Sequence, residues 1–518
     1  MPGKRKRPYS DIDFTLKRVF KKPVFRPLQR EVIIATLEGE DVFLQAATSF
    51  GKSLCYQLPA VVDFGSKWNI YTIRSCTKKM KVTIVISPLL ALMNNQVASM
   101  RHANIRVETI NSTTSQEDRA RIIEDLQCGH PLTRLLYVTP EFCQGDHFRK
   151  ILRVIHSQRE LARIAVDEAH CVSEWGHDFR PSFQQLSFFK KEFPDVPIIC
   201  LTATATSRVR DDIIKTLALN PQKLRMFRMT TSRPNLHYEV RFKSEENGDH
   251  YDDFLSWLKA AHARRADNAA RASQLASTNQ RSTNVAGIIY TLFRRDCESL
   301  AARLRADGIG AVPYHAGLSH AERADALAGW VANKEGYDVV VATTAFGMGI
   351  DKENVRFVVH WQIPKSFEGF YQEAGRAGRD GKASVCILYY GREDRDRAAN
   401  LLARDQARQA GGPASKKDLH VRGSTAGYGE HVSAQQGMLQ NRAKSLQALV
   451  EYCERTDACR HGLIARYFGD EEVPECDFAC DWCKDAEALV RRKEGGLASE
   501  EWCSTQRAEG RYNVDEYD

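Results

Sequence analysis

The chain has 518 residues and a formal net charge of +8 at pH 7. One hydrophobic core does not grow to this size, so we expect two or three domains. The sequence has no run of eighteen apolar residues and no charged-then-apolar leader, so it predicts an intracellular protein without a membrane span, a secretory signal or a membrane partner. The mild positive charge permits a polyanionic partner without requiring one.

The N-terminal segment contains four consecutive basic residues, Lys4 to Arg7. We expect residues 1–22 to form a basic disordered tail. A nuclear import signal and a solvated tail that touches phosphates both remain open as interpretations.

Two series of short β-branched runs alternate with helical stretches. The first lies in residues 23–222 and comprises "DVFLQAA", "KVTIVISP", "RLLYVTP", "RIAVDEAH" and "PIICLTATA"; the second lies in residues 223–392 and comprises "AGIIYTL", "AVPYHAG", "DVVVATTA", "VRFVVHW" and "ASVCILYY". Such alternation predicts parallel sheets built from βαβ units. We therefore expect two tandem α/β lobes, joined near "TSRPNLHY", where Pro234 breaks the periodicity.

Two segments, residues 263–284 and 407–431, are poor in large apolar side chains. We expect both to be mobile surface insertions. The second falls in a predicted linker at residues 393–440. A cysteine-containing domain at residues 441–485 and a polar tail at residues 486–518 are expected to follow.

The stretch "LQAATSFGKSLCYQLPA" predicts a phosphate-binding loop. A strand that ends at Gln45, a short turn and then Gly51, Lys52 and Ser53 at the start of a helix let backbone N–H groups surround phosphates. The lysine then reaches the terminal phosphates and the hydroxyl binds Mg²⁺. A GKS tripeptide alone is weak evidence, and the flanking strand and helix supply the context that it needs.

An acidic pair, Asp167 and Glu168, follows the apolar run "RIAV". Parallel sheets place their ligands at the ends of strands, so a role at the nucleotide is favoured over a pair of surface carboxylates. Asp167 is expected to hold Mg²⁺ through water, and Glu168 to orient or deprotonate the attacking water.

The stretch "YQEAGRAGRDG" in the second lobe contains Gln372, Arg376 and Arg379. Their spacing lets two guanidinium groups reach the nucleotide and neutralise charge that develops on the γ-phosphate. An arginine pair taken alone is more often a surface salt-bridge partner. Together with Lys52 and the acidic pair, it favours ATP hydrolysis.

Eight segments resemble, in order, the motifs of the RecQ family of superfamily 2 DNA helicases: "FRPLQ", "GKSLCYQLPA", "ISPLLALMNNQV", "DEAHCVSEWGHDFRP", "LTATA", "YHAGL", "ATTAFGMGIDKENVRFVVHW" and "QEAGRAGRDG". The resemblance covers residues 24–483 and implies two RecA-like parallel-sheet lobes followed by a small helical zinc-binding domain. It also implies ATP and Mg²⁺ as cofactors. By resemblance, the nucleotide site would include Arg26 and Gln29, which would hold adenine, and Thr48, Gly51, Lys52, Ser53 and His170.

The same resemblance gives the loop after the acidic pair a role in sensing DNA. Trp175, His177, Phe179 and Arg180 would detect single-stranded DNA and signal to the ATPase site, since bases stack on aromatic and guanidinium planes. An aromatic cluster that packs the lobe is the alternative. In the same way, Thr202 and Thr204 would link the ATP state to lobe movement, although two threonines after a strand also suit a helix cap. Further along, Thr343, Thr344 and Asp351 would contact the DNA backbone and the nucleotide site.

The C-terminal cysteines have the spacing of a metal site. Cys476, Cys480 and Cys483 form a CxxxCxxC run that one distant cysteine would complete as a closed tetrahedral zinc site with a structural role. Cys453 and Cys459 compete for the fourth place. The family places its ligand just before a basic residue, which favours Cys459.

Two departures from the family pattern modify these expectations. The family usually has glycine at the position of Ser49 and often at that of Phe50, so we expect reduced nucleotide affinity or turnover. The lysine, the acidic pair and the arginine pair are all present. Only a short polar segment follows Cys483, so we expect no winged-helix domain and no further C-terminal domain.

The resemblance and the motifs together predict an ATP-dependent 3′-to-5′ DNA helicase that acts on single-stranded and forked duplex DNA in nuclear repair and recombination. Two alternatives stay open. One is a translocase or strand-annealing factor with weak unwinding. The other is a DNA-binding protein with a degenerate ATPase.

Overall fold

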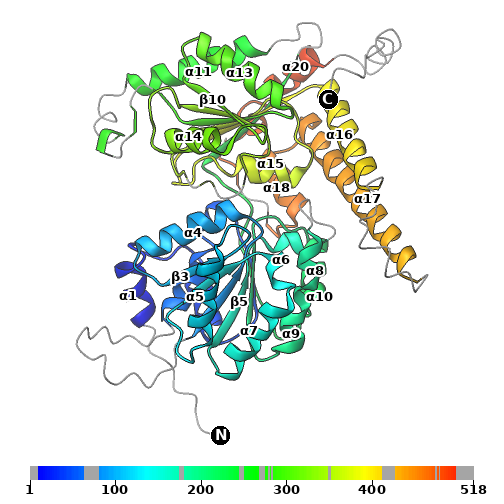
Figure 1. Cartoon of the computed structure of the whole chain (residues 1–518). Coiled ribbons are helices and arrows are strands. Elements are labelled where there is room, and N and C mark those ends of the chain that lie inside the picture. The colour runs from blue at the N-terminus through cyan, green and yellow to red at the C-terminus, as the bar shows by residue number, and fades with distance from the viewer. Residues whose placement is uncertain are drawn as a thin grey trace. The chain divides into compact units, whose positions relative to one another are not determined.

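The computed structural model describes residues 10–62, 81–173, 180–243, 250–267, 275–277, 280–281, 284–347, 350, 352–410, 426–472, 475–477 and 479–497. The chain divides into two compact units (Figure 1). Unit 1 comprises Met1–Thr231 with Met348–Ile350, and unit 2 comprises Ser232–Gly347 with Asp351–Asp518. Among the described residues, no helix combines the length and the apolar character that crossing a membrane requires.

Unit 1 is built on a seven-stranded sheet with the order β3-β4-β2-β5-β6-β1-β7, in which every pair of neighbours is parallel. Its middle strands are buried on both faces and rich in Val, Ile and Leu, as parallel strands between helices are. The strands are β1 Val42–Gln45, β2 Val82–Ile86, β3 Val107–Ile110, β4 Leu135–Val138, β5 Leu161–Val166, β6 Ile198–Thr202 and β7 Arg225–Arg228.

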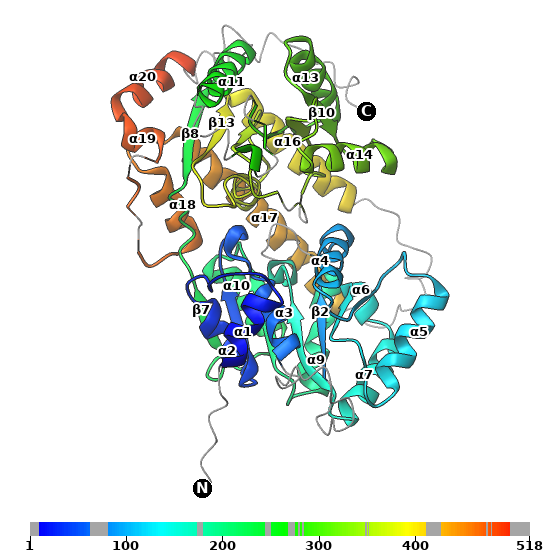
Figure 2. The same cartoon turned by 90° about the vertical axis from the view of Figure 1, so that its left-hand side faces the viewer.

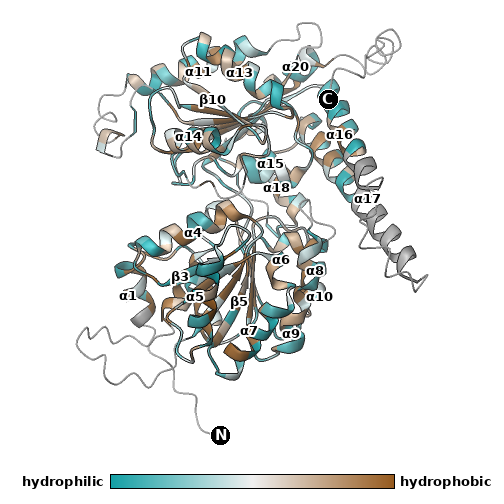
Figure 3. Cartoon of the chain, viewed as in Figure 1, coloured by the Kyte–Doolittle hydropathy of each residue, from teal (hydrophilic) through white to brown (hydrophobic). Residues whose placement is uncertain are grey.

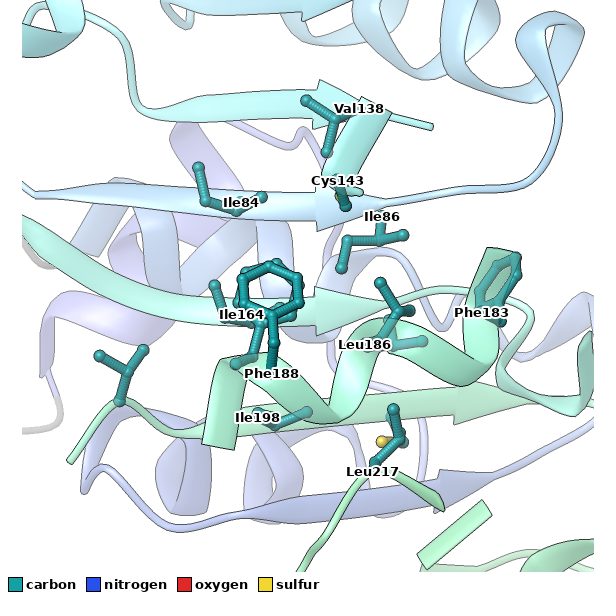
Figure 4. Packing of buried hydrophobic residues seen from close by; sticks show 14 of the residues in the cluster. Ile84, Ile86, Val138, Cys143, Ile164, Phe183, Leu186, Phe188, Ile198 and Leu217 are labelled. Atoms are coloured by element: carbon teal, nitrogen blue, oxygen red, sulfur yellow. The ribbon is translucent and has the colours of Figure 1, made fainter. Parts of the chain in front are cut away.

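Helices cover both faces of this sheet, because successive strand side chains point to opposite sides. Phe43 belongs to the hydrophobic cluster on one face and Leu44 to the cluster on the other. Figure 4 shows the first cluster, in which Ile84, Ile164 and Ile198 from three strands lie beside Phe188. The helices are α1 Ser10–Arg18, α2 Gln29–Leu37, α3 Leu54–Val62, α4 Leu90–His102, α5 Gln116–Gln127, α6 Pro140–Cys143, α7 Asp146–Ser157, α8 Pro181–Gln184, α9 Phe188–Glu192 and α10 Ser207–Thr216, with 3₁₀ turns η1 Thr48–Phe50, η2 Ala169–Val172 and η3 Gln185–Ser187.

Unit 2 is built on a six-stranded sheet with the order β10-β11-β9-β12-β13-β8, also parallel throughout. Figure 3 shows its strands as hydrophobic segments enclosed by helices with polar outer faces. The strands are β8 Leu236–Phe242, β9 Gly287–Tyr290, β10 Ala311–Tyr314, β11 Val339–Ala342, β12 Phe357–His360 and β13 Ser384–Tyr390. The helices are α11 Tyr251–Ala266, α13 Arg294–Ala306, α14 His320–Val331, α15 Phe367–Ala374, α16 Arg392–Ala410, α17 Ala426–Glu454, α18 Arg460–Phe468, α19 Asp481–Lys484 and α20 Ala486–Gly496.

The expected fold class, two parallel-sheet α/β lobes followed by a helical region with a cysteine cluster, is confirmed. Three segments differ from the local expectation. Helix α1 lies within the expected N-terminal tail, because Ile12 and Leu16 recur one turn apart and are both buried. Helices α16 and α17 fill most of the expected linker, whose Ala, Arg, Gln and Glu residues favour helix. The expected polar tail begins with α20, which buries Leu489. Residues 411–425 and 498–518 lie outside the described residues.

Candidate functional site

The predicted phosphate loop connects β1 to α3 at the carboxyl edge of the unit 1 sheet. The turn η1 follows the strand, and Gly51 adopts a left-handed conformation with φ of 81° just before the helix begins. A Cβ atom at this position would also lie 3.1 Å from Nε2 of Gln29. The backbone conformation at position 51 therefore favours glycine, and a side chain there would also need Gln29 to shift.

The lysine of this loop is buried against the loop itself. Lys52 Nζ donates to the carbonyl oxygens of Ala46 at 3.0 Å and Ala47 at 3.3 Å. Ser53 follows it at the start of α3, and Thr48 lies at the start of η1. The loop thus carries a cation and two hydroxyl groups at a strand-to-helix turn, which is the arrangement that binds phosphate and Mg²⁺.

The glutamine of "FRPLQ" contacts the same loop. Gln29 is buried, and its Nε2 donates to the carbonyl oxygens of Phe50 at 2.8 Å and Gly51 at 3.3 Å, while its Oε1 accepts from the Arg26 backbone N–H at 2.9 Å. Through these bonds Gln29 ties the start of α2 to the phosphate loop.

The departure at Ser49 and Phe50 has a structural counterpart. Phe50 is 5% exposed, because its ring packs into the hydrophobic cluster with Val32, Leu44 and Tyr56. Ser49 is half-buried in η1. The aromatic side chain is therefore directed into the core of unit 1.

The acidic pair follows β5. Asp167 Oδ1 accepts from the Glu168 backbone N–H at 3.0 Å, and its Oδ2 accepts from the Tyr56 hydroxyl at 3.4 Å. Burial and the neighbouring Glu168 carboxylate raise the pKa of Asp167 to about 7, and the charge of Lys52 opposes this shift. Glu168 has a φ of 50°, which for a non-glycine residue is uncommon outside functional sites and turns. The pair is thus a buried acidic centre within electrostatic reach of Lys52.

A buried histidine links the acidic pair to the next strand. His170 Nδ1 lies 3.4 Å from Glu168 Oε2 and 3.1 Å from Thr202 Oγ1 at the end of β6. The Thr202 hydroxyl also accepts from the Thr204 backbone N–H at 3.2 Å. Four of the predicted site residues therefore form one chain of contacts, and the helix-cap interpretation of the threonines does not describe it, since Thr206 is the residue that caps α10.

Most of the predicted DNA-sensing loop lies outside the described residues, including Trp175, His177 and Phe179. Arg180, at its end, is described. Its Nη1 donates to the Pro88 carbonyl oxygen at 2.8 Å, so it contacts the segment that leads into α4.

In unit 2, the predicted arginines follow α15. Gln372 lies on this helix and is buried, Arg376 is 5% exposed, and Arg379 is half-buried. The charge of Arg376 opposes the rise in the pKa of Tyr290 that burial causes, so the guanidinium lies near this tyrosine. The Tyr290 hydroxyl donates to the Phe346 carbonyl oxygen at 2.8 Å. The guanidinium therefore lies beside the end of β9. A surface salt bridge does not account for Arg376.

The remaining unit 2 residues follow β11. Thr343 is half-buried, with its Oγ1 accepting from the Ala345 backbone N–H at 3.4 Å, and Thr344 is exposed. Asp351 lies outside the described residues.

The four predicted zinc ligands come together in unit 2. The Sγ atoms of Cys459, Cys476, Cys480 and Cys483 all lie within 4.8 Å of one another. Four thiolates at such a spacing form a closed tetrahedral site suited to structural zinc. Cys453 is instead buried in α17, where burial raises the pKa of its thiol, and it stands outside the cluster.

The cysteine cluster is joined to the edge of the unit 2 sheet. Cys480 forms a parallel bridge with Tyr238 of β8, the Tyr238 N–H donates to the Ala479 carbonyl oxygen at 3.1 Å, and the Val240 N–H donates to Asp481 Oδ2 at 2.9 Å. Asp481 also receives two hydrogen bonds from Arg460, at 2.8 and 3.1 Å, in a fully buried ion pair. The cluster therefore belongs to the body of unit 2. Figure 2 shows α19, which follows Cys480 directly, beside β8.

Three family descriptions match successive parts of the chain: DEAD/DEAH box helicase over residues 26–213, helicase conserved C-terminal domain over residues 269–381, and RecQ zinc-binding over residues 393–484. The third match contains the whole cysteine cluster. Over most of its length the chain resembles the RecQ family.

Curated relatives of this chain include ATP-dependent DNA helicase Q5 of Rattus norvegicus, which is 39% identical over 95% of this chain and 45% of its own length. ATP-dependent helicase SGS1 of Saccharomyces cerevisiae is 36% identical over 94% of this chain and 29% of its own length. The chain thus spans less than half the length of these two relatives.

Among solved structures, the chain resembles the DUF1998 helicase MrfA bound to DNA, with a TM-score of 0.55, 16% identity, and coverage of 77% of this chain and 51% of that one. At this identity the likeness shows the fold alone.

Sequence reasoning missed two tyrosines of the candidate site. Tyr56 contacts Asp167 across 111 residues of sequence, and Tyr290 contacts the arginine loop. Tyr56 lies within the phosphate-loop stretch, one helical turn after Ser53. This spacing could have indicated from the sequence that Tyr56 lies near the site. Tyr290 ends a strand, as site residues of parallel sheets often do.

Proposed function

We propose that this chain is an ATP-dependent 3′-to-5′ DNA helicase of RecQ type, in which ATP hydrolysis drives movement along single-stranded DNA and unwinding of forked duplexes. The observation that carries the proposal is the grouping in unit 1 of the Lys52 loop with the buried Asp167 and the adjacent, half-buried Glu168. The family matches and the names of the relatives support it.

In this proposal, Lys52 contacts the β- and γ-phosphates once they displace the Ala46 and Ala47 carbonyl oxygens as its partners. Ser53 and Asp167 hold Mg²⁺, which stabilises charge on the phosphates, and Glu168 orients the attacking water. The pKa of Asp167, raised in the protein alone, would fall beside the metal, because a cation favours the ionised carboxylate. Arg26, Gln29, Thr48, Gly51 and His170 complete the nucleotide site.

Unit 2 contributes positive charge and structure. We assign Gln372, Arg376 and Arg379 to stabilising the γ-phosphate in the transition state. Zn²⁺ held by Cys459, Cys476, Cys480 and Cys483 stabilises the C-terminal region and has no catalytic position open.

The DNA-coupling residues are proposed from the family resemblance. They are Trp175, His177, Phe179, Arg180, Thr202, Thr204, Thr343, Thr344 and Asp351. The contacts of His170 with Glu168 and Thr202 support this assignment, since they give the acidic pair a direct path to the threonines. A nuclear location and a role in repair or recombination follow from the same resemblance.

A DNA-binding protein with a degenerate ATPase is the second candidate, which Ser49 and Phe50 in the phosphate loop favour. The burial of the Phe50 ring supports the active enzyme instead, because the ring packs into the hydrophobic core of unit 1. A translocase with weak unwinding differs only in the outcome on duplex DNA.

The test measures ATP turnover of the full chain with and without single-stranded DNA, and then strand separation on a forked duplex. We expect DNA-stimulated turnover and unwinding, both lost in Lys52→Ala and retained in the control Lys150→Ala, an exposed lysine on α7. Turnover without strand separation would identify a translocase. Equal turnover in Lys52→Ala and the parent chain would refute the site.

A further inference from the structure

One buried arginine outside the residues assigned above is directed at the arginine loop, defined here as residues 375–379. Arg233 is the second residue of unit 2, in the segment that leads into β8, and is 5% exposed. Its Nη1 donates to the Gly375 carbonyl oxygen at 2.7 Å, and its Nη2 donates to those of Ala377 at 2.9 Å and Gly378 at 2.7 Å. One guanidinium thus holds three backbone carbonyls of the loop that carries Arg376 and Arg379.

The chemistry of these bonds makes them strong and specific. A buried, charge-assisted hydrogen bond is roughly twice as strong as a neutral one. The carbonyls lie just beyond the C-terminus of α15, where the helix dipole favours a cation. A guanidinium presents its donors in a rigid planar fork, whereas a lysine offers one compact ammonium group, so lysine does not reproduce all three contacts.

A second side chain of the same segment supports the far end of the loop. Asn235 Nδ2 donates to the Gly378 carbonyl oxygen at 2.9 Å and to that of Lys382 at 3.0 Å. Gly378 has a φ of 55°, and a Cβ atom there would lie 2.5 Å from Asn235 Nδ2. The loop is therefore shaped around the segment 233–235, and glycine at 378 is what permits the close approach.

The loop in turn fixes the Arg376 side chain. Backbone bonds from Arg376 N to the Glu373 carbonyl oxygen and from Ala377 N to that of Ala374 continue the helix into the loop. The guanidinium then meets Tyr290. Displacement of the carbonyls on either side of Arg376 would move this side chain away from Tyr290.

We propose that Arg233 is a positioning residue for ATP hydrolysis, which acts through Arg376 by holding the arginine loop in place. The inference rests on the proposed function, because it assumes that Arg376 stabilises the transition state. Arg233 itself touches no reacting atom in this scheme.

ATP hydrolysis kinetics of the full chain, measured with single-stranded DNA, test the positioning role of Arg233. We expect Arg233→Lys to lower kcat for ATP by about 10- to 100-fold with KM nearly unchanged, since small misplacements near the chemistry have costs of this order. The control is Arg265→Lys, a buried arginine of α11 that donates to the Arg281 carbonyl oxygen and does not contact the loop; it should keep kcat. A parental kcat in Arg233→Lys would overturn the proposal.

A double-mutant cycle separates positioning from general destabilisation. If Arg233 acts through Arg376, Arg233→Lys combined with Arg376→Ala should be no slower than Arg376→Ala alone. Losses of kcat that multiply would show that Arg233 acts independently of Arg376, which contradicts the proposal.

Hydrogen exchange gives a readout that does not depend on activity. In Arg233→Lys, the backbone amides of residues 373–384 should exchange at least about tenfold faster, while peptides from β9 and β12 keep parental rates. If the parent chain proves inactive, the proposed function fails and this measurement alone decides the positioning. Unchanged exchange in residues 373–384, or equal acceleration throughout unit 2, would refute it.

Discussion

His170 Nδ1 lies 3.1 Å from Thr202 Oγ1, and both side chains are fully buried between β6 and the turn after the acidic pair. Through His170, this contact connects Glu168 to the segment that contains Thr204. If ATP hydrolysis drives movement as proposed, a single substitution at this contact tests the coupling between them.

The first prediction concerns that contact. Thr202→Val keeps the shape of the side chain and removes its hydroxyl. The ATPase rate with DNA should change little, while the number of base pairs unwound per ATP falls about fivefold. A fivefold change corresponds to the loss of one hydrogen bond of about 1 kcal/mol. ATPase and forked-duplex assays on the same preparation measure the ratio. Thr83→Val, a buried threonine of β2, is the matched control. Proportional losses of ATPase and unwinding would argue against a coupling role.

The second prediction distinguishes the two candidates for the fourth zinc ligand. Cys459→Ser and Cys480→Ser should each lose the one zinc ion per chain and expose residues 441–485 to rapid hydrogen exchange, because thiolate binding supplies folding energy there. Cys453→Ser and Cys128→Ser should retain the metal. Metal analysis of freshly purified protein decides, and zinc retained in Cys459→Ser would exclude Cys459.

The third prediction addresses the loop that contains Trp175 and Phe179. Trp175→Ala should leave basal ATPase nearly unchanged and abolish its stimulation by single-stranded DNA. One stacked base contributes about 1–3 kcal/mol, so DNA affinity should fall less than the stimulation does. Turnover is measured across a DNA titration, with the exposed Phe14→Ala as control.

Two outcomes would contradict this role of the loop. Full stimulation of Trp175→Ala at saturating DNA would mean that the ring only helps binding. Loss of basal turnover together with thermal stability would mean that the aromatic side chains form part of the lobe core.

The fourth prediction concerns pH. Burial and the charges of Arg265 and Arg281 lower the pKa of His262 to about 4 from an ordinary value of 6.5. The folded state therefore favours the neutral imidazole. Its contribution to the free energy of unfolding is fully present above pH 6.5 and is lost as the pH falls toward 4. Chemical unfolding at several pH values should show a steeper loss of stability in the parent than in His262→Gln, by at most about 1.4 kcal/mol per pH unit. If the stability of the parent and that of His262→Gln fall equally steeply with pH, the lowered pKa of His262 is refuted.

Much of the fold could be predicted from the sequence, because central parallel strands are continuous apolar runs. All ten strands named from such runs are present, from β1 "VFLQ" to β13 "SVCILYY". The three that were missed, β3, β7 and β8, mix polar and apolar residues; β3 and β7 form the two edges of the unit 1 sheet, and β8 forms one edge of the unit 2 sheet. Edge strands are half-covered, so their composition resembles that of loops.

The candidate site was predictable where its chemistry is local. Gly51, Lys52 and Ser53 are adjacent in sequence, as are Asp167 and Glu168, and the cysteine spacing is short. The contacts of Arg233 with Gly375, Ala377 and Gly378 bridge more than 140 residues. No local pattern encodes such a contact, since it exists only after β8 has paired with β13.

The bridge between Cys480 and Tyr238 gives the metal site a consequence for solubility. Strand β8 is the last strand of its sheet, and the outward N–H groups of Tyr238 and Val240 are satisfied by Ala479 and Asp481. Release of zinc would free these donors on an edge strand, and unpaired edge strands are the surface on which sheets of separate molecules join edge to edge. Metal-depleted chains are therefore expected to associate with one another in a concentration-dependent manner, while unit 1 still binds nucleotide.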